Sequence, residues 1–365
     1  MDGSRYLRLL GLPQLFGTSR TKEILDVNPT VIPYREEAKE VSVFVYDYDA
    51  ENLNVFQSSS VDECLHFKTS NRLSWINIDG LRKSEVEKVC DHYGVHYLLI
   101  EDILSINQRP KMDEVEGVMF CLLNMLYFND ANKTVETEQI SIVLGKEFVI
   151  SFQEDASRDV FDPLRVRFNL PKSQIRQRSA DYLLYAMLDM IVDNYFLVME
   201  KLGEQIEILE EDVIRKSNTR SLARINQLRK EQIILKRNIA PVRDLIGSII
   251  RSESELLEDN TTKYFKDVYD HIVQAYDLSE NYRDIMMSMQ DLYINNVNLK
   301  MNEVMKVMAI VTCVLAPATV IGGIFGMNFD FIPYAHHQLG FYFAVAAMLL
   351  IPMWMLWEFR KRGWF

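Results

Sequence analysis

The chain has 365 residues, and its 52 Asp and Glu outnumber its 40 Lys and Arg to give a formal net charge of −12 at pH 7. Such an acidic balance argues against nucleic acid as a partner. The mean hydropathy of −0.08 and the 25% of charged residues are those of an ordinary soluble protein, but a polar majority can dilute short apolar segments in such averages. No phosphate-binding loop of the form Gly-x-x-x-x-Gly-Lys-Ser/Thr and no dinucleotide fingerprint occurs, so we expect no nucleotide either.

Residues 1–175 are expected to form a cytosolic mixed α/β sandwich. No signal peptide is evident, because the apolar residues between Tyr6 and Leu15 are interrupted by Arg8, Gly11 and Pro13. Segments rich in β-branched and aromatic residues predict strands, and two segments between them predict helices. The predicted strands are Val41–Tyr46, Leu73–Ile78, Gly117–Phe128, Glu138–Leu144 and Phe148–Phe152, and the predicted helices are Lys83–Tyr93 and Tyr97–Ile106.

Residues 176–260 are expected to form a cytosolic helical hairpin. From Ala180 onward the strand pattern disappears, and apolar residues recur at helical spacing. Turn and capping residues in Lys216–Ser221 predict a break. A second helical pattern then continues to about Leu257, with a pause at Pro241.

Residues 261–328 are expected to form one long helix. A helical pattern that starts near Thr262 meets no strong breaker until Pro317, and if it continues to Asn328 it has 67 residues and a length of about 100 Å. Its last part, residues 307–328, has no charged side chain and is long enough to cross a hydrocarbon core of roughly 30 Å. The pattern therefore predicts a cytosolic stalk and a first transmembrane span in one helix.

A second apolar stretch, from Leu339 to Trp357, predicts a second span within residues 341–365, and residues 329–340 are the loop between the spans. The basic tripeptide Arg360-Lys361-Arg362 directly follows this span, whereas the loop contains no Lys or Arg. Positive charges favour the cytosolic side of a membrane. The sequence thus predicts a multi-pass protein of the cell (inner) membrane with both termini in the cytosol.

The end of the long helix carries a specific motif. Residues Ile324 to Phe329 read Ile-Phe-Gly-Met-Asn-Phe, which resembles the signature that ends the first transmembrane helix of the CorA family of divalent-cation channels, with Phe325 where the usual form has Tyr. Other segments resemble the family in the same order and cover the chain from about residue 70 to its end. They are His96–Leu104, Gln108–Lys111, Ala180–Tyr185, Asp267–His271 and Asn302–Val307.

The resemblance implies an α+β membrane protein that assembles as a homopentameric funnel in a lipid bilayer. The implied activity is passive uptake of hydrated Mg2+, driven by the membrane potential, through a channel that cytosolic Mg2+ gates. Co2+ and Ni2+ are further candidate cargo. Divalent cations would then be both cargo and regulator, and no enzymatic activity is expected.

Gly326, Met327 and Asn328 are the expected selectivity filter. Mg2+ gives up its hydration water reluctantly, so a ring of neutral Asn328 carbonyl groups, which accept hydrogen bonds from that water, suits rapid passage better than a ring of carboxylates. The alternative interpretation is a simple C-terminal helix cap, where Gly and Asn are common. In the outer loop, Asp330 matches the first of two acids often found in the family, but Tyr334 stands where the second is expected.

One face of the long helix is the expected pore lining. Thr312 and Thr319, the only hydroxyl residues of the first span, lie seven residues apart and so share a face. From the residues alone, a pore lining and a helix-packing surface are about equally good interpretations of this stripe. The resemblance favours a pore, because the family's first spans surround the conduction path, and apolar rings there would exclude water when the pore closes. The stripe comprises Asp291, Ile294, Asn298, Met301, Asn302, Met305, Met308, Thr312, Ala316 and Thr319.

The resemblance also implies regulatory metal sites in the cytosolic part. In the family, the carboxylates that match Asp102 and Asp267 face each other across neighbouring protomers and bind a divalent ion, and Glu101 and Asp189 are expected near a second site. Oxygen ligands suit Mg2+. Bound Mg2+ would hold a closed pentamer, and its loss would let the carboxylates repel one another. The acidic cluster Glu204–Asp212 is the next candidate sensor, although it also fits an ordinary solvated helix face.

Two other functions stay open. A proton-coupled Zn2+ transporter of the related ZntB type typically departs from Met in the Gly-Met-Asn signature, so Met327 argues against it. A membrane-tethered cytosolic sensor or enzyme is the more distant alternative. No Ser/His/Asp, Cys/His or dense metal-ligand pattern in the sequence supports catalysis.

Overall fold

The computed structural model describes residues 37–364, except residues 71, 107, 156–157, 171, 216 and 329–338. The chain divides into two compact units, unit 1 (Met1–Gln290) and unit 2 (Asp291–Phe365). One helix, α9 (Asp259–Phe325), has 67 residues and contributes to both units. The long helix predicted from the sequence is confirmed, with its ends three residues earlier than expected.

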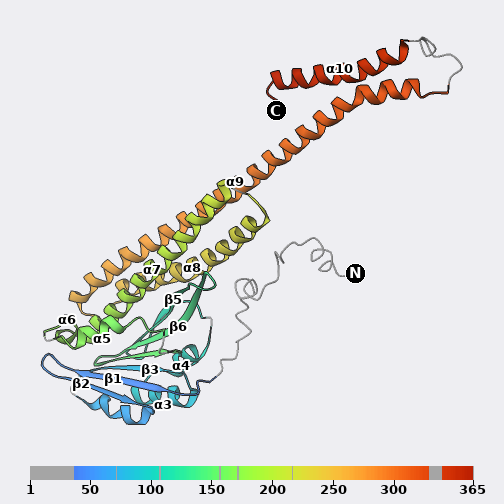
Figure 1. The fold of residues 1–365 in the computed structure, drawn as a ribbon. Coiled ribbons are helices and arrows are strands. Elements are labelled where there is room, and N and C mark those ends of the chain that lie inside the picture. The colour runs from blue at the N-terminus through green and yellow to red at the C-terminus, as the bar shows by residue number, and fades with distance from the viewer. Residues whose placement is uncertain are drawn as a thin grey trace. The chain divides into compact units, whose positions relative to one another are not determined.

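The centre of unit 1 is a seven-stranded sheet with the strand order β2-β1-β3-β7-β6-β5-β4 (Figure 1). Strands β3 and β7 pair in parallel, and all other neighbours pair antiparallel. The inner strands are buried along most of their length, as a sheet covered on both faces requires. The strands are β1 (Ser42–Tyr48), β2 (Leu53–Ser58), β3 (Leu73–Asp79), β4 (Lys111–Val115), β5 (Val118–Asn129), β6 (Thr134–Leu144) and β7 (Phe148–Gln153).

Helices cover both faces of this sheet, which confirms the predicted mixed α/β sandwich. One face packs against η1, α3 and α4, and its core includes Val45, Ile76 and Phe120. The alternate residues Tyr46 and Trp75 point to the other face, where both rings stack on a phenylalanine of α5, and α7 and α8 cover the remaining strands. The helices are η1 (Val61–Thr69), α3 (Lys83–Tyr93), α4 (Tyr97–Leu104), α5 (Asp162–Phe168), α6 (Gln174–Gln177), α7 (Ala180–Arg215) and α8 (Thr219–Arg251).

Helices α7 and α8 form the predicted hairpin, with two local differences. The side chain of Asn218 caps α8 by accepting a hydrogen bond from the amide of Ser221 at 3.0 Å, within the break that the sequence predicts. The expected pause at Pro241 is absent, since α8 continues through this residue, and α8 ends at Arg251 rather than near Leu257. Burial of Pro241 and its apolar neighbours against the fold outweighs the one backbone hydrogen bond that proline cannot donate.

The first part of α9 is anchored to this hairpin within unit 1. The hydroxyl of Tyr282 donates to the carbonyl of Met199 on α7 at 3.0 Å, and the amide of Gln232 on α8 donates to the carbonyl of Ser279 at 3.2 Å. A Cβ atom at Gly203 would lie 2.6 Å from the Tyr282 hydroxyl, so only glycine permits this approach. Unit 1 therefore holds about half of the long helix rigidly.

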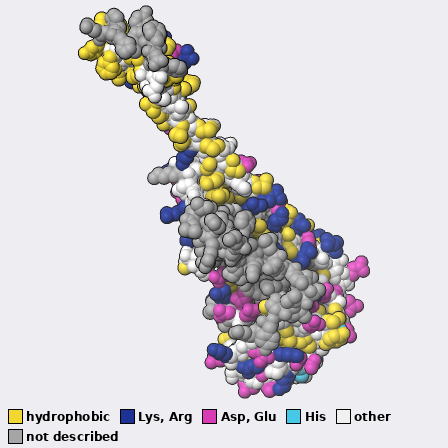
Figure 2. All heavy atoms as spheres, turned by 90° about the vertical axis from the view of Figure 1, so that its right-hand side faces the viewer, with side chains coloured by type: hydrophobic (Ala, Val, Ile, Leu, Met, Phe, Trp, Pro, Cys, Tyr) yellow, Lys and Arg dark blue, Asp and Glu magenta, His cyan; other side chains and the backbone are white. Residues whose placement is uncertain are grey.

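Unit 2 consists of the rest of α9 and of α10 (Gly340–Lys361). Among the described residues, three helices are long and apolar enough to cross a membrane, namely α7, α9 and α10. The apolar stretch of α7 is largely packed inside unit 1, whereas those of α9 and α10 are not buried at all. Figure 2 shows hydrophobic side chains gathered over α9 and α10 of unit 2, while charged side chains gather over unit 1.

Candidate functional site

The Gly-Met-Asn segment directly follows the last turn of α9. The amide of Gly326 donates to the carbonyl of Gly322 at 3.0 Å, and the amide of Met327 donates to that of Ile324 at 3.3 Å. Gly326 does not have the positive φ of a left-handed helix cap, so that explanation for the glycine does not apply. A Cβ atom at this position would lie 3.1 Å from the Gly322 oxygen, which is closer than most Cβ contacts.

The side chains of Met327 and Asn328 are exposed at this end of α9. The loop that follows contains two residues considered from the sequence, Asp330 and Tyr334, and both lie outside the described residues. The proposed filter is therefore described up to Asn328, and the outer loop stays a prediction.

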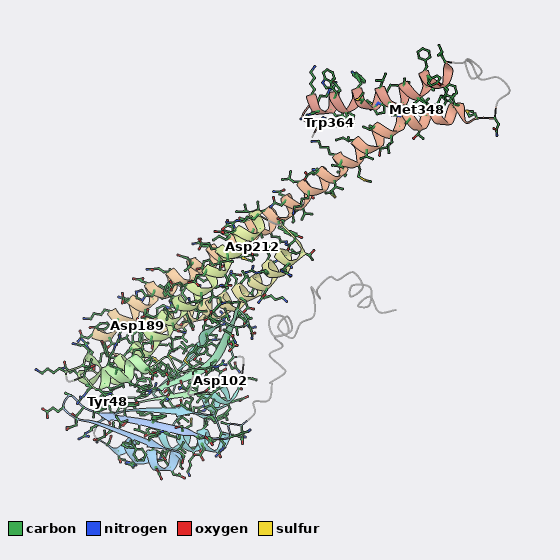
Figure 3. The ribbon with its side chains drawn as sticks, in the orientation of Figure 1. Tyr48, Asp102, Asp189, Asp212, Met348 and Trp364 are labelled. Carbon is green, nitrogen blue, oxygen red and sulfur yellow. The ribbon has the colours of Figure 1, made fainter. Side chains whose placement is uncertain are left out.

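The ten residues of the predicted pore stripe are all exposed in the single chain. Exposure alone does not single them out, because most of α9 in unit 2 is exposed. The direction in which these residues point around α9, relative to α10, is more informative. A row of half-buried residues at helical spacing marks the side of α9 that faces α10, where a Cβ atom at Gly322 would lie 3.6 Å from Met348 (Figure 3). This row comprises Ile310, Val314, Pro317, Ala318 and Ile321.

The two threonines point away from that row. Thr312 lies two residues from both Ile310 and Val314, and Thr319 lies two residues from both Pro317 and Ile321. Two residues correspond to about 200° around a helix. The stripe with the threonines is therefore on the side of α9 opposite to α10.

The hydroxyl protons of both threonines are already used within the helix. Thr312 donates to the carbonyl of Met308 at 2.9 Å, and Thr319 donates to that of Leu315 at 3.1 Å. The remaining lone pairs of each hydroxyl are free to accept hydrogen bonds. Each threonine therefore presents an acceptor to whatever lies beside this face.

In unit 1, carboxylates of α7 and α9 form a cluster with an imidazole. Asp189, Asp193 and His271 each have a ligand atom within 4.8 Å of the others, and Nδ1 of His271 lies 3.8 Å from Oδ1 of Asp193. Burial raises the pKa of Asp189, and the nearby carboxylates of Asp193 and Asp267 raise it further, while His271 and Arg167 oppose them. A divalent cation would relieve this repulsion. Carboxylate oxygens suit Mg2+, whereas imidazole is a ligand for transition metals such as Zn2+ and Ni2+.

Sequence reasoning named Asp189 and Asp267 but missed Asp193 and His271. Both missed residues lie four positions after a named one, on the same helix face. The available signals were a pair of aspartates at i and i+4 on α7 and an aspartate and a histidine at i and i+4 on α9. These pairs indicate a site only when α7 and α9 pack together.

Asp102 lies elsewhere in unit 1, on α4. Its Oδ2 accepts a hydrogen bond from Nζ of Lys111 at 2.6 Å, and the same ammonium lies 2.9 Å from Oδ2 of Asp113. Burial disfavours the charge on Lys111, but the carboxylates of Asp102 and Asp113 outweigh this and raise its pKa. Figure 3 shows Asp102 well separated from Asp189. The exposed Glu101 precedes Asp102 on α4.

The acidic cluster Glu204–Asp212 is largely paired with basic side chains. Glu204 lies 3.4 Å from Lys201, Glu211 lies 3.3 Å from Arg215, and Asp212 lies 2.6 Å from Arg224 of α8. Ion pairs of this kind are common on solvated helix surfaces. The geometry favours the solvated-face interpretation over a cation sensor.

Comparison with known proteins adds independent information. The family model described as CorA-like Mg2+ transporter protein matches residues 70–361. The chain is 37% identical over 332 residues to the cobalt/magnesium transport protein CorA of Thermotoga maritima, which covers 91% of this chain and 93% of that protein. It is 20% identical over 329 residues to the zinc transport protein ZntB of Yersinia pseudotuberculosis, with 90% and 98% covered. Its fold resembles the complete structure of the CorA magnesium transporter from Methanocaldococcus jannaschii, with a TM-score of 0.73 and 23% identity over 88% of this chain and 98% of that one.

Proposed function

The chain belongs to the CorA-like Mg2+ transporter family, a family of membrane transporters and not of enzymes, and from this membership we propose that it is a channel for hydrated Mg2+. In this proposal five copies surround one pore, and flow is passive and gated by cytosolic Mg2+. Co2+ and Ni2+ are further cargo. An inside-negative potential favours entry of a divalent ion by roughly 4.6 kcal/mol per 100 mV, so no nucleotide is needed.

The single observation that carries the proposal is the opposition of two stripes on α9. One stripe faces α10, and the other holds Thr312 and Thr319 on the far side. A span that served only as an anchor would need no polar stripe turned away from its neighbour, because lipid favours apolar side chains there. If copies of α9 surround a pore with α10 outside, both stripes are explained.

The polar groups of this stripe suit a hydrated cation. The water molecules around Mg2+ present their hydrogen atoms outward, so a pore that passes the hydrated ion should present hydrogen-bond acceptors. The hydroxyls of Thr312 and Thr319 do so because their protons are donated to the helix backbone. In the proposal, Asn328 supplies a ring of amide carbonyls at the outer end, with Gly326 allowing the close backbone approach.

The apolar members of the stripe are the proposed gate. Ile294, Met301, Met305 and Met308 are exposed in the single chain, and symmetric copies would bring each of them into a ring. Narrow apolar rings exclude water and so block a hydrated ion. Asp291, Asn298, Asn302 and Ala316 complete the proposed lining between these rings.

Two sets of carboxylates are the proposed sensor. Asp189 shares a cluster with Asp193 and His271 in one copy, and Asp267 is near enough to raise the pKa of Asp189. Asp102 with Glu101 would approach from the neighbouring copy. Mg2+ bound between them would neutralise the repulsion and favour a closed pentamer. When cytosolic Mg2+ falls, the repulsion returns and the stalks separate, so the ion inhibits its own entry.

Transport by purified protein in sealed vesicles tests this function. We expect entry of Mg2+ that an inside-negative potential accelerates and a proton gradient leaves unchanged. Entry of Zn2+ that depends on a proton gradient would favour the ZntB-like alternative. If no divalent ion enters at any internal Mg2+ concentration, the spans are tethers and the channel proposal is wrong.

A further inference from the structure

Lys111 lies between two carboxylates in a part of unit 1 that the proposed mechanism does not yet use. Its Nζ atom is 2.6 Å from Oδ2 of Asp102 and 2.9 Å from Oδ2 of Asp113. Lys111 and Asp113 are alternate residues of the edge strand β4, so they share one face of it. Glu114, on the opposite face of β4, instead accepts hydrogen bonds from Ser252 and Ser254.

The position of Asp102 is fixed independently of this lysine. The side-chain amide of Gln139 donates to the main-chain carbonyls of Asp102 and Ser105, at 3.3 Å and 2.9 Å. Ser105 also donates through its hydroxyl to the carbonyl of Glu101 at 2.7 Å. These bonds hold the last turn of α4 against β6, so Lys111 is not needed to position the Asp102 backbone.

We propose that Lys111 is a built-in counter-cation that occupies Asp102 in the absence of Mg2+ and thereby sets the Mg2+ concentration at which the sensor fills. This inference rests on the proposed role of Asp102 in the sensor. A divalent ion that approaches Asp102 meets an ammonium already bound to one oxygen, and it must either displace that ammonium or bear its repulsion.

Asp113 gives the displaced ammonium a second place to bind. Lys111 already contacts both carboxylates, so a small rotation of its flexible side chain can release Asp102 and keep the bond to Asp113. The competition is therefore weaker than that of a lysine with a single partner. Lys111 raises the Mg2+ threshold, and Asp113 lowers it again.

The test measures how Mg2+ protects the cytosolic part of the purified full-length protein from protease, at low ionic strength. A unit charge a few ångströms from a divalent ion, in a dielectric close to that of water, changes binding by roughly tenfold. We expect Lys111→Gln to lower the Mg2+ midpoint for protection by about tenfold. Lys111→Arg keeps the charge and should stay near the wild-type midpoint. Lys83→Gln is the matched control. This exposed lysine of α3 pairs with Glu87, so its substitution removes the same charge at a place away from Asp102.

Asp113→Asn should shift the midpoint in the opposite direction. Without its second partner, Lys111 stays on Asp102, and more Mg2+ is needed for protection. In a Lys111→Gln background the same Asp113→Asn change should have little further effect. An equal rise in the Mg2+ midpoint in the wild-type and Lys111→Gln backgrounds would show that Asp113 acts only as a nearby negative charge. Its assigned role as a second partner of Lys111 would then be wrong.

The outcomes separate this inference from the function on which it rests. If Asp102→Ala leaves the Mg2+ titration unchanged, the proposed sensor itself fails. If Asp102→Ala weakens protection but Lys111→Gln leaves the midpoint unchanged or raises it, the sensor stands and the counter-cation role is wrong. Loss of protection in Lys111→Gln together with retention in Lys111→Arg would show that the lysine stabilises the site rather than competing for it.

Discussion

The two units differ in where their apolar side chains lie. In unit 1 the apolar side chains form a core and the charged ones are outside, whereas in unit 2 large apolar side chains such as Met308, Leu349 and Trp354 are more than 60% exposed. Unit 1 is therefore a complete fold in one copy, and unit 2 has no interior of its own. In the proposed function it is surrounded by lipid and by further copies, so the roles proposed for its residues depend on their direction around α9 rather than on contacts within one copy.

The sharpest test of this contrast is a change in unit 2 that leaves unit 1 untouched. Asn328→Ala removes the proposed ring of carbonyl acceptors, and we expect Mg2+ flux into vesicles to fall to background. Mg2+-dependent protease protection of unit 1 and the assembled oligomer should be unchanged in the same preparation. Wild-type flux through an assembled Asn328→Ala protein would remove Asn328 from the filter.

A charge on the pore stripe should have a large effect of the opposite sign. Met305→Asp or Met308→Asp places a hydrated group in a proposed apolar ring, so the pore should fill with water and leak at high internal Mg2+. Met287→Asp is the matched control, because Met287 is an exposed methionine of the same helix within unit 1. If both pore variants stay closed, the stripe has been assigned to the wrong face of α9.

The sensor proposed in unit 1 can be altered by two substitutions of different expected effect. Asp267→Lys would place an ammonium near Asp102 of the neighbouring copy, and protection from protease should then lose its Mg2+ dependence. Asp267→Ala removes one ligand and should only weaken protection at moderate Mg2+. Asp270→Ala is the control, since it is another exposed aspartate on the same helix. A wild-type titration for Asp267→Ala would rule out this carboxylate pair as the sensor.

The sequence predicts the inner parts of the fold better than its edges. The five strands expected from β-branched and aromatic residues are all present; four have ends within two residues of the prediction, and β6 begins four residues earlier than expected. Strands β2 and β4 were missed, and they are the two edge strands of the sheet. Edge strands are short and carry charged residues to avoid pairing with other chains, and the sequence of β4, Lys-Met-Asp-Glu-Val, shows this. The pattern that protects an edge also hides it from prediction.

The residues of the candidate site also differ in how well the sequence predicts them. A seven-residue spacing was sufficient to predict the stripe of Thr312 and Thr319, because one helix places both residues on a face whatever surrounds it. The contact of His271 with Asp193 joins two helices that are far apart in the chain, and the contact of Lys111 with Asp102 joins a strand to the helix before it. No local pattern specifies such a contact, so these partners became visible only with the packing of α7 on α9 and of β4 beside α4.

The smallest expected effect lies within unit 1 and concerns Glu138 of β6. Its Oε1 accepts hydrogen bonds from the amides of Glu154 and Asp155, at 3.0 Å and 2.9 Å. Its Oε2 is buried. Burial raises the pKa of Glu138 to about 7, although the two amides oppose this. Because the folded state binds this proton more tightly than the unfolded state, the contribution of Glu138 to stability is greatest below pH 4.5 and is lost as the pH rises through about 7.

Each pKa unit corresponds to about 1.4 kcal/mol, so this residue should cost the fold about 3 kcal/mol by pH 8, which is roughly 5 °C in the midpoint of thermal unfolding. Glu138→Gln keeps the acceptor for both amides and cannot ionise, so it should flatten the fall in midpoint between pH 5 and pH 8. The exposed Glu147, on the turn before β7, gives the matched change Glu147→Gln, which should leave the slope as in wild type. Because Glu138 lies in a fold that is complete in one copy, the same difference in slope should appear with Mg2+ and with chelator. If the difference in pH slope between wild type and Glu138→Gln disappeared with chelator, the core of unit 1 would depend on neighbouring copies of the chain. That result would contradict the contrast between the two units.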